Sequence, residues 1–270
     1  MAKKKILLLS DDLRMSSGVG TMSREFVLGT LKHYDWVQVG GAIKHPDEGK
    51  VIDMNESVRK DSGVEDAYLK IYPTSGYGNP DMIRQIIQVE GGVDAILHYT
   101  DPRFWGWLYQ MEHELRRTTP IFYYNIWDDL PYPRWNEPFY ESCDLIMNIS
   151  KQTVNIVDNV CQITPRTDWD NTYVPHGINE NNFYPIDSSH KEWGDLLKFK
   201  RNVTGNKDYK YIVFWNNRNI RRKLPGDVVM AYKQFCDQLP KEEAKKCVLI
   251  MHTQPRDENG TDLPEVVKQV

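Results

Sequence analysis

The sequence predicts an α/β protein: a Rossmann-like doubly wound parallel sheet, followed by a second, incomplete α/β unit. Short apolar runs alternate with longer amphipathic stretches over the first 160 residues, and the same alternation returns after residue 205. Alternating strands and helices favour a parallel sheet that is covered on both faces. With 270 residues, of which 40% are hydrophobic, the chain exceeds a typical single domain and can build a sizeable core.

The first part of the chain supplies most of this alternation. The apolar run 4–10 predicts a buried strand, and the amphipathic stretch 20–34 predicts a helix. Further strands are predicted at 35–43, 68–74, 93–100, 120–127 and 144–150, and further helices at 79–92, 103–118 and up to residue 160. Pro80 near the start of one helix and two glycines at its end are typical helix boundaries. We assign residues 1–175 to a first domain.

The composition changes after this domain. Residues 164–195 are rich in Pro, Asn, Asp, Ser and Gly and contain only a brief strand at 172–177, so we expect 176–205 to be an interdomain linker region. Residues 206–270 return to the α/β pattern, with strands at 209–218 and 246–253 and helices at 227–239 and 263–270. Two strands are too few for an independent α/β domain, so we expect this second domain to be truncated.

Charge and composition exclude several classes of function. The net charge is −4 and the pI about 6.0, so no overall basic field attracts nucleic acid, and we do not expect it as a partner. The apolar run near the N-terminus is too short for a signal peptide and acidic residues follow it; no stretch reaches the ~20 apolar residues of a membrane span. The four scattered cysteines indicate buried thiols and a cytoplasmic location.

Ligands of open parallel sheets bind beyond the carboxyl ends of the strands, so the loops that follow strands are the candidate sites. The first loop, "SDDLRMSSGVG", places Gly18 and Gly20 before a helix. Backbone N–H groups at such a helix start suit a phosphate or a sugar hydroxyl. The loop is neither G-x-G-x-x-G nor a Walker loop, and a plain strand-to-helix turn is an equal alternative.

Two further loops carry polar side chains. His98 lies at the end of strand 93–100; a structural histidine is the alternative to a functional one. Asp128 and Asp129 follow strand 120–127, where either carboxylate could orient a ligand hydroxyl or accept a proton, or serve turn chemistry before Pro131. The aromatic residues at 104–109 favour core packing over sugar stacking.

A basic loop follows the strand predicted at 209–218. It contains Arg218, Arg221, Arg222 and Lys223 within six residues. Arginine binds phosphate in a bidentate manner and lysine acts as a point charge, so we favour a diphosphate clamp over a solvated charge run.

Taken together, these segments resemble the retaining nucleotide-sugar glycosyltransferases of the GT-B fold, glycosyltransferase family 4. "SSGVGTMSREFVLGTL" resembles the family's Gly-Gly-Val-Gly loop and first helix, and "PIFYYNIWDDLP" its strand ending in His-Asp. "TYVPHGINENNFYPI" is close to the interdomain signature V-I-P-N-G-V-D-x-x-x-F-x-P. "IVFWNNRNIRRKLPGD" resembles the start of the family's donor domain. The resemblance covers essentially the whole chain.

The resemblance implies transfer of a sugar, with retained configuration, from a nucleotide-sugar donor to an acceptor that the sequence does not identify. It implies that residues 1–175 are the acceptor-side domain and that residues 206–270 are the start of the nucleotide-sugar-binding domain, where Arg218 and Lys223 hold the donor diphosphate. The cleft loop would include Gly18, Gly20, His176 and Asn179, and the catalytic residues would be Asp128, Asp129 and His98. Neither a metal nor a cofactor is expected, because the nucleotide-sugar is the substrate and cationic side chains neutralise its charge.

The sequence also departs from the family. Trp127 stands where the family has its active-site histidine, and Leu224 and Pro225 replace the glycine after the lysine. No Glu-x7-Glu segment follows residue 227, so we expect a fragment or a reduced relative that is not competent for catalysis alone. Two alternatives stay open: a non-catalytic GT-B-like module that binds carbohydrate or protein, and a glycosyltransferase that acts on modified DNA bases.

Overall fold

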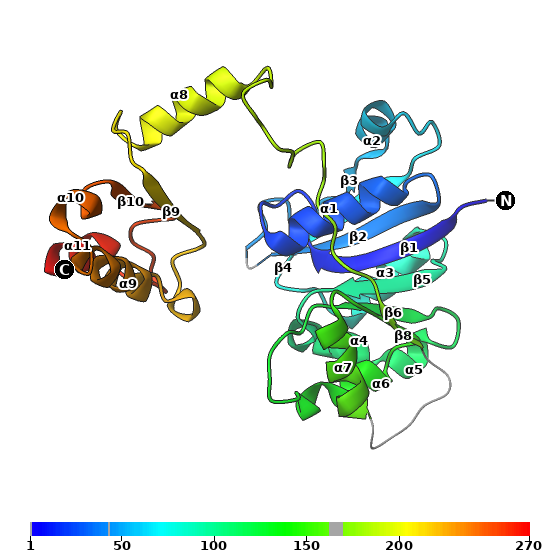
Figure 1. Ribbon diagram of the computed structural model, residues 1–270. Coiled ribbons are helices and arrows are strands. Elements are labelled where there is room, and N and C mark those ends of the chain that lie inside the picture. Colours follow the sequence, from blue (N-terminus) through cyan, green and yellow to red (C-terminus); the bar gives the residue numbers. More distant parts are fainter. Residues whose placement is uncertain (1, 43, 162–169) are drawn as a thin grey trace. The chain divides into compact units, whose positions relative to one another are not determined.

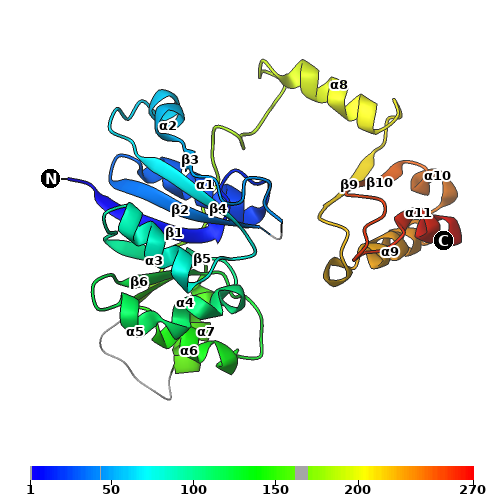
Figure 2. The same cartoon turned by 180° about the vertical axis from the view of Figure 1, so that it is seen from behind.

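The computed structural model describes residues 2–42, 44–161 and 170–270. The chain divides into two compact units, Met1–Glu180 and Asn181–Val270, and this division lies inside the predicted linker region 176–205. Figures 1 and 2 show the elements of both units from opposite sides.

The first unit is built on an eight-stranded sheet with the order β3-β4-β2-β1-β5-β6-β7-β8. Its strands are β1 (Lys4–Asp11), β2 (Tyr34–Ala42), β3 (Ile52–Asp53), β4 (Leu69–Ser75), β5 (Ala95–Tyr99), β6 (Ile121–Asn125), β7 (Leu145–Asn148) and β8 (Asp170–Tyr173). Neighbouring strands are parallel, apart from the short β3, which pairs antiparallel with β4. The predicted doubly wound sheet is confirmed.

Helices cover both faces of this sheet (Figures 1 and 2). They are α1 (Gly18–Thr30), α2 (Asn55–Ser62), α3 (Pro80–Val89), α4 (Gly106–Gln110), α5 (Glu112–Leu115), α6 (Glu137–Glu141) and α7 (Lys151–Val160). Successive side chains of a strand point to opposite faces. In β1, Leu7 and Leu9 therefore pack with the helices from α3 to α7, whereas Ile6 and Leu8 pack with α1 and α2.

The prediction of one continuous helix at 103–118 is wrong. The segment forms the 3-10 turn η1 (Pro102–Trp105), then α4 and α5, and its helical structure ends at Leu115. The backbone leaves helical geometry at Trp105 and Met111. Trp105, Leu108 and Leu115 are all buried in the same hydrophobic core. The interruptions of the helix at Trp105 and Met111 allow this aromatic-rich segment to place all three side chains there.

The second unit contains a two-stranded parallel sheet of β9 (Tyr211–Asn216) and β10 (Cys247–His252), at the predicted strand positions. Its helices are α8 (Trp193–Val203), α9 (Pro225–Asp237), α10 (Lys241–Ala244) and α11 (Leu263–Gln269). The sequence reading missed α8, which starts within the polar stretch read as a connection. The part of that stretch at 164–169 lies outside the described residues.

Cysteine burial matches the thiol prediction: Cys143, Cys161 and Cys247 are buried and Cys236 is half-buried. Within the described ranges, no helix has the length and apolar character needed to span a membrane.

Candidate functional site

The chain reverses its direction of travel across the first sheet between β1 and β5. From β1 it moves outward through β2 to β4, and then it returns to the other side of β1 at β5. The loops after β1 and β5 therefore leave in opposite directions, which opens the crevice where doubly wound proteins bind ligands. Asp11 is the last residue of β1 and Asp12 follows it, and Tyr99 is the last residue of β5.

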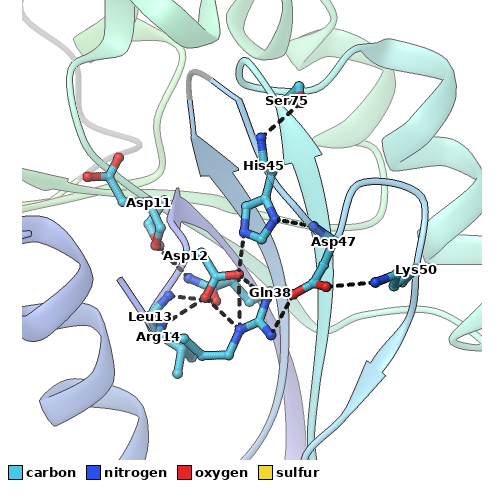
Figure 3. A network of polar contacts seen from close by, with 10 residues as sticks. Asp11, Asp12, Leu13, Arg14, Gln38, His45, Asp47, Lys50 and Ser75 are labelled. Carbon is cyan, nitrogen blue, oxygen red and sulfur yellow. Dashed lines mark hydrogen bonds and ion pairs between the residues drawn. The ribbon is translucent and has the colours of Figure 1, made fainter. Parts of the chain in front are cut away.

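Asp12 is the centre of a polar network at this edge (Figure 3). Its buried carboxylate lies 2.7 Å from Arg14 Nη2 and 3.0 Å from His45 Nε2. Burial alone would raise the pKa of Asp12, but the hydrogen bonds from Arg14 and His45 outweigh it and the pKa is lowered. Arg14 also donates to Asp47 Oδ2 at 3.2 Å. Asp12 is thus an ionised carboxylate whose partners belong to the protein, and it braces the loop.

His45 fastens the loop after β2 to this network. Its Nδ1 accepts a hydrogen bond from the backbone N–H of Asp47 at 3.1 Å, which assigns the ring proton to Nε2, the atom that donates to Asp12. The backbone N–H of His45 donates to Ser75 Oγ at 3.0 Å, at the end of β4. A Cβ on Gly40 of β2 would lie 2.9 Å from the Asp12 carboxylate, so this close packing requires glycine.

Asp11 has a different environment from Asp12. Its Oδ2 accepts a hydrogen bond from Ser17 Oγ at 3.0 Å, and Ser17 Oγ accepts from the backbone N–H of Gly20 as the N-cap of α1. Burial raises the pKa of Asp11, and the bond from Ser17 opposes that rise. A half-buried carboxyl with a raised pKa at a switch point is a candidate acid, base or hydroxyl-binding group. The sequence reading missed it, although its position after an apolar strand is a usable signal.

The two glycines of the first loop have different surroundings. A Cβ on Gly20 would lie 2.7 Å from Met15 O and 2.8 Å from Asp12 O, so the turn itself needs glycine there. A Cβ on Gly18 would meet no atom of the described residues within 4 Å. Gly18 therefore faces open space, and its role at a cleft stays a prediction.

His98 lies in the core and not at the strand-end surface. Its side chain is fully buried, Nδ1 is 2.6 Å from Tyr109 Oη, and the ring stacks on Tyr123 at 5.1 Å between centroids. Burial lowers the pKa of His98 to about 3, so the imidazole is neutral at physiological pH. This environment is typical of a structural histidine, which is the alternative given above for His98. A catalytic role for His98 stays a prediction.

Asp128 and Asp129 are exposed in the loop after β6. Asp129 Oδ1 accepts from the backbone N–H of Leu130 at 2.9 Å, and Asp129 O accepts from Trp127 Nε1 at 3.1 Å. Gln152 Nε2 donates to Asp128 O at 3.0 Å, which anchors the loop to α7. Both carboxylates reach solvent from a fixed backbone, so they can contact a ligand.

The segment 174–179 lies against α1 and the end of β5. His176 Nε2 is 3.4 Å from Tyr99 Oη, and burial lowers the pKa of His176. Asn179 Nδ2 donates to Glu25 Oε2 of α1 at 3.0 Å. A cavity of about 240 Å³ separates this segment from α1 and is lined by Met22, Glu25, Phe26, Tyr124, Val174, Pro175, Gly177, Ile178 and Asn179. Of the predicted cleft residues, Asn179 thus contacts α1, and His176 contacts Tyr99 at the end of β5.

In the second unit, the basic loop follows β9 and contains the 3-10 turn η4 (Arg221–Lys223). The buried Asn219 holds this loop. Its Nδ2 donates to Thr261 O at 2.7 Å and to Gln254 O at 3.1 Å, and its Oδ1 accepts from the Thr261 N–H at 2.9 Å. A Cβ on Gly260 would collide with the backbone of Asn219. The loop is therefore held in a defined position.

The cations of this loop differ in their pairing. Arg218 Nε donates to Asp257 Oδ2 at 3.1 Å. Arg221, Arg222 and Lys223 form no ion pair with any residue that the structure describes. The next residue, Leu224, has a φ of +46°, a region that favours glycine. This leucine leads directly into α9, whose N-terminus therefore adjoins the basic turn.

In the described part of the chain, no group of three or more His, Cys, Asp or Glu side chains could hold a metal ion; the absence of a metal requirement stays a prediction.

Comparisons with solved structures identify the fold. A trehalose-phosphate synthase (UDP-forming) from Burkholderia xenovorans, in complex with glucose-6-phosphate, matches with a TM-score of 0.58 at 10% identity, over 98% of this chain and 69% of that chain. The enzyme from Burkholderia vietnamiensis matches with a TM-score of 0.56 at 11% identity, over 100% and 68%. The Burkholderia multivorans enzyme matches with 0.55 at 12% identity, over 100% and 68%.

No protein-family model and no curated protein matches this chain. The structural likeness shows that the chain has the GT-B glycosyltransferase fold. Membership of family 4 stays a prediction.

Proposed function

We propose that this chain is a glycosyltransferase that takes a sugar from a nucleotide-sugar donor and passes it to an acceptor hydroxyl with retained configuration. The observation that carries this proposal is the anchored basic turn at 218–223, with three cations that lack an ion pair among the described residues, next to the start of α9. The fold shared with UDP-forming trehalose-phosphate synthases supports it. A cytoplasmic location and metal independence are part of the same proposal.

The basic turn is suited to a diphosphate. Lys223 supplies a point charge, and the start of α9 supplies the positive end of the helix dipole and the backbone N–H of Gly226. Pro225 has no N–H, and the N–H groups of Asp227 and Val228 donate to Leu224 O. The bond from Arg218 Nε to Asp257 fixes the guanidinium while its terminal nitrogens stay available to phosphate oxygens. Fixed cations of this kind stabilise the charge that develops on a departing nucleoside diphosphate.

In the transfer step, the bond from the anomeric carbon to the diphosphate oxygen breaks, and its electron pair leaves with the nucleoside diphosphate. The acceptor oxygen forms the new bond to that carbon through an oxocarbenium-like transition state. The acceptor hydroxyl loses its proton to a carboxylate, and we propose Asp128 or Asp129, which are exposed after β6.

Isothermal titration calorimetry with UDP, GDP and ADP tests the donor site. We expect at least one of them to bind the complete chain, and we expect Lys223→Ala and Arg218→Ala each to weaken that binding about tenfold or more, because each removes a charge-assisted hydrogen bond. Lys233→Ala is the matched control: this lysine lies on α9 and pairs with Asp237 at 2.6 Å. The proposal fails if no nucleotide binds, or if Lys223→Ala and Lys233→Ala have the same effect.

A second candidate is a non-catalytic module that binds carbohydrate. The burial of His98 and the presence of Trp127 in place of the expected histidine favour it. Mass spectrometry after incubation with UDP-, GDP- and ADP-sugars separates the two candidates. Release of nucleoside diphosphate from at least one donor contradicts the non-catalytic module, which leaves all of them intact.

A further inference from the structure

Two large aromatic side chains are exposed in the loops that follow β5 and β6. Phe104 of η1 is 57% exposed, and Trp135 of the 3-10 turn η2 (Arg134–Asn136) is 56% exposed. Exposed aromatic rings at the ligand-binding edge of a sheet indicate a recognition surface when their positions are fixed.

The ring of Phe104 is fixed from below. It stacks on Tyr77 with 5.0 Å between centroids and 14° between planes. Tyr77 in turn makes an edge contact of 5.5 Å with the fully buried Trp105, and its backbone O accepts from Trp107 Nε1 at 3.1 Å. Phe104 is therefore the outer member of a stack that ends in the core, and its free face is presented to solvent.

The ring of Trp135 is fixed in a comparable way. It packs edge to face on Trp127 at 6.1 Å, and Trp127 is held by its bond to Asp129 O. The guanidinium of Arg103 lies over the Trp127 ring at 5.4 Å, a favourable cation–π distance. Arg103 adjoins Phe104 in sequence, so the residue next to Phe104 contacts the Trp127–Trp135 pair. We call these four residues the aromatic platform.

Beside the platform, the two exposed carboxylates of Asp128 and Asp129 outnumber the one exposed guanidinium of Arg134, whose Nη1 donates to Val160 O at 2.8 Å. Arg103 is neutralised by Asp101, whose carboxylate oxygens lie 2.9 and 2.5 Å from its nitrogens. The exposed carboxylates of Asp128 and Asp129 form no ion pair with the residues described in the structure. Carboxylates without a cation repel phosphate groups and accept hydrogen bonds from hydroxyl groups.

We propose that the aromatic platform binds the acceptor of the proposed transfer, and that this acceptor is a neutral saccharide. The role of the saccharide as acceptor rests on the proposed function, whereas its binding to the platform does not. The apolar C–H face of a sugar ring stacks on Phe104 and Trp135, and its hydroxyls hydrogen-bond to Asp128 and Asp129. A nucleic acid could stack on the rings, but its phosphates would meet the acidic rim, so the platform disfavours modified DNA as the acceptor.

Saturation-transfer difference NMR tests this inference on the complete chain without nucleotide. The probes are maltotriose, cellotriose and mannotriose as neutral saccharides, with glucose 6-phosphate and a ten-residue oligothymidylate as anionic ligands. We expect saturation on the ring C–H protons of at least one neutral saccharide. We expect Phe104→Ala and Trp135→Ala to weaken its affinity on the order of tenfold, because each removes an aromatic face.

Tyr34→Ala is the matched control, because Tyr34 is 38% exposed at the start of β2, at the opposite end of the sheet. It is expected to bind like the unchanged chain. Circular dichroism of each variant confirms that it folds. The inference is overturned if no neutral saccharide binds, if the two platform variants bind as Tyr34→Ala does, or if an anionic ligand is preferred at physiological salt.

This result is distinguishable from that of the donor site. If saccharides bind at the platform and no nucleotide binds the basic turn, the proposed transfer falls while the platform stands as a carbohydrate-binding surface. If nucleotides bind and the saccharides do not, the donor site stands and the acceptor inference falls.

Discussion

At the scale of single residues, His98 illustrates how a polar side chain at a strand end becomes part of a core. Its hydrogen bond to Tyr109 and its stack on Tyr123 hold the neutral ring in a fully buried site. Protonation would place a charge in this site, and for that reason the pKa falls to about 3. The stability of the fold is therefore linked to pH through this one residue.

His98 is expected to make the protein less stable in mild acid. Its pKa is about 3 in the fold and about 6.5 in the unfolded chain, so below pH 6.5 the unfolded chain binds the extra proton. The free energy of unfolding then falls by about 1.4 kcal/mol for each pH unit from this group. Urea unfolding at pH 7 and pH 5 should show a loss about 2 kcal/mol larger in the natural chain than in His98→Gln. Equal losses would contradict the linkage.

Asp11 and Asp12 show what sequence reasoning can and cannot reach at this scale. Asp11 and Asp12 come at the end of an apolar run, a signal that would have placed both carboxylates at the ligand-binding edge, where they lie. The sequence could not separate their roles, because His45 reaches Asp12 only through the pairing of β1 with β2. The same holds for the burial of His98, which depends on rings from β6 and α4.

At the scale of elements, the start of α1 depends on the lack of a side chain at Gly20. The turn from Asp12 to Ser17 folds back so that two carbonyl oxygens lie where a Cβ of residue 20 would be. The N-cap bond from the Gly20 N–H to Ser17 Oγ is made in the same turn. A substitution at residue 20 therefore disturbs both the turn and the cap.

Gly20→Ala is expected to lower the free energy of unfolding by about 1–3 kcal/mol, because backbone oxygens at 2.7 and 2.8 Å cannot move as a flexible side chain can. Gly18→Ala, in the same turn, should be neutral or slightly stabilising, since the space is open and alanine favours a helix. Thermal unfolding of the two variants side by side measures this. A larger loss for Gly18→Ala would show that the turn is arranged differently.

Most elements could be predicted from hydrophobic pattern, and the exceptions share physical causes. Strands β1, β2, β4, β5 and β6 lie within two residues of their predicted bounds because they are buried apolar runs. Helix α2 and strand β3 were missed because that segment is short and mostly polar. The helix predicted at 103–118 breaks because tertiary packing of its rings overrides local periodicity.

At the scale of the whole molecule, the two units carry different parts of the proposed chemistry. The first unit has a complete doubly wound sheet with carboxylates and an aromatic platform at its ligand-binding edge. The second unit has two parallel strands and an anchored basic turn. The sequence suggests two units because an α/β pattern stops and restarts, and the assigned domain bounds stay a prediction. The fold comparison confirms the expected fold class.

The central claim is that a nucleoside diphosphate binds the basic turn of the second unit and not the glycine turn of the first. Hydrogen–deuterium exchange of the complete chain, with and without saturating UDP, GDP or ADP, tests this claim most directly. The account predicts slower exchange of backbone amides at 217–228 with at least one nucleotide and no change at 16–21. Protection at 16–21 without protection at 217–228, or no protection with any nucleotide, would contradict it.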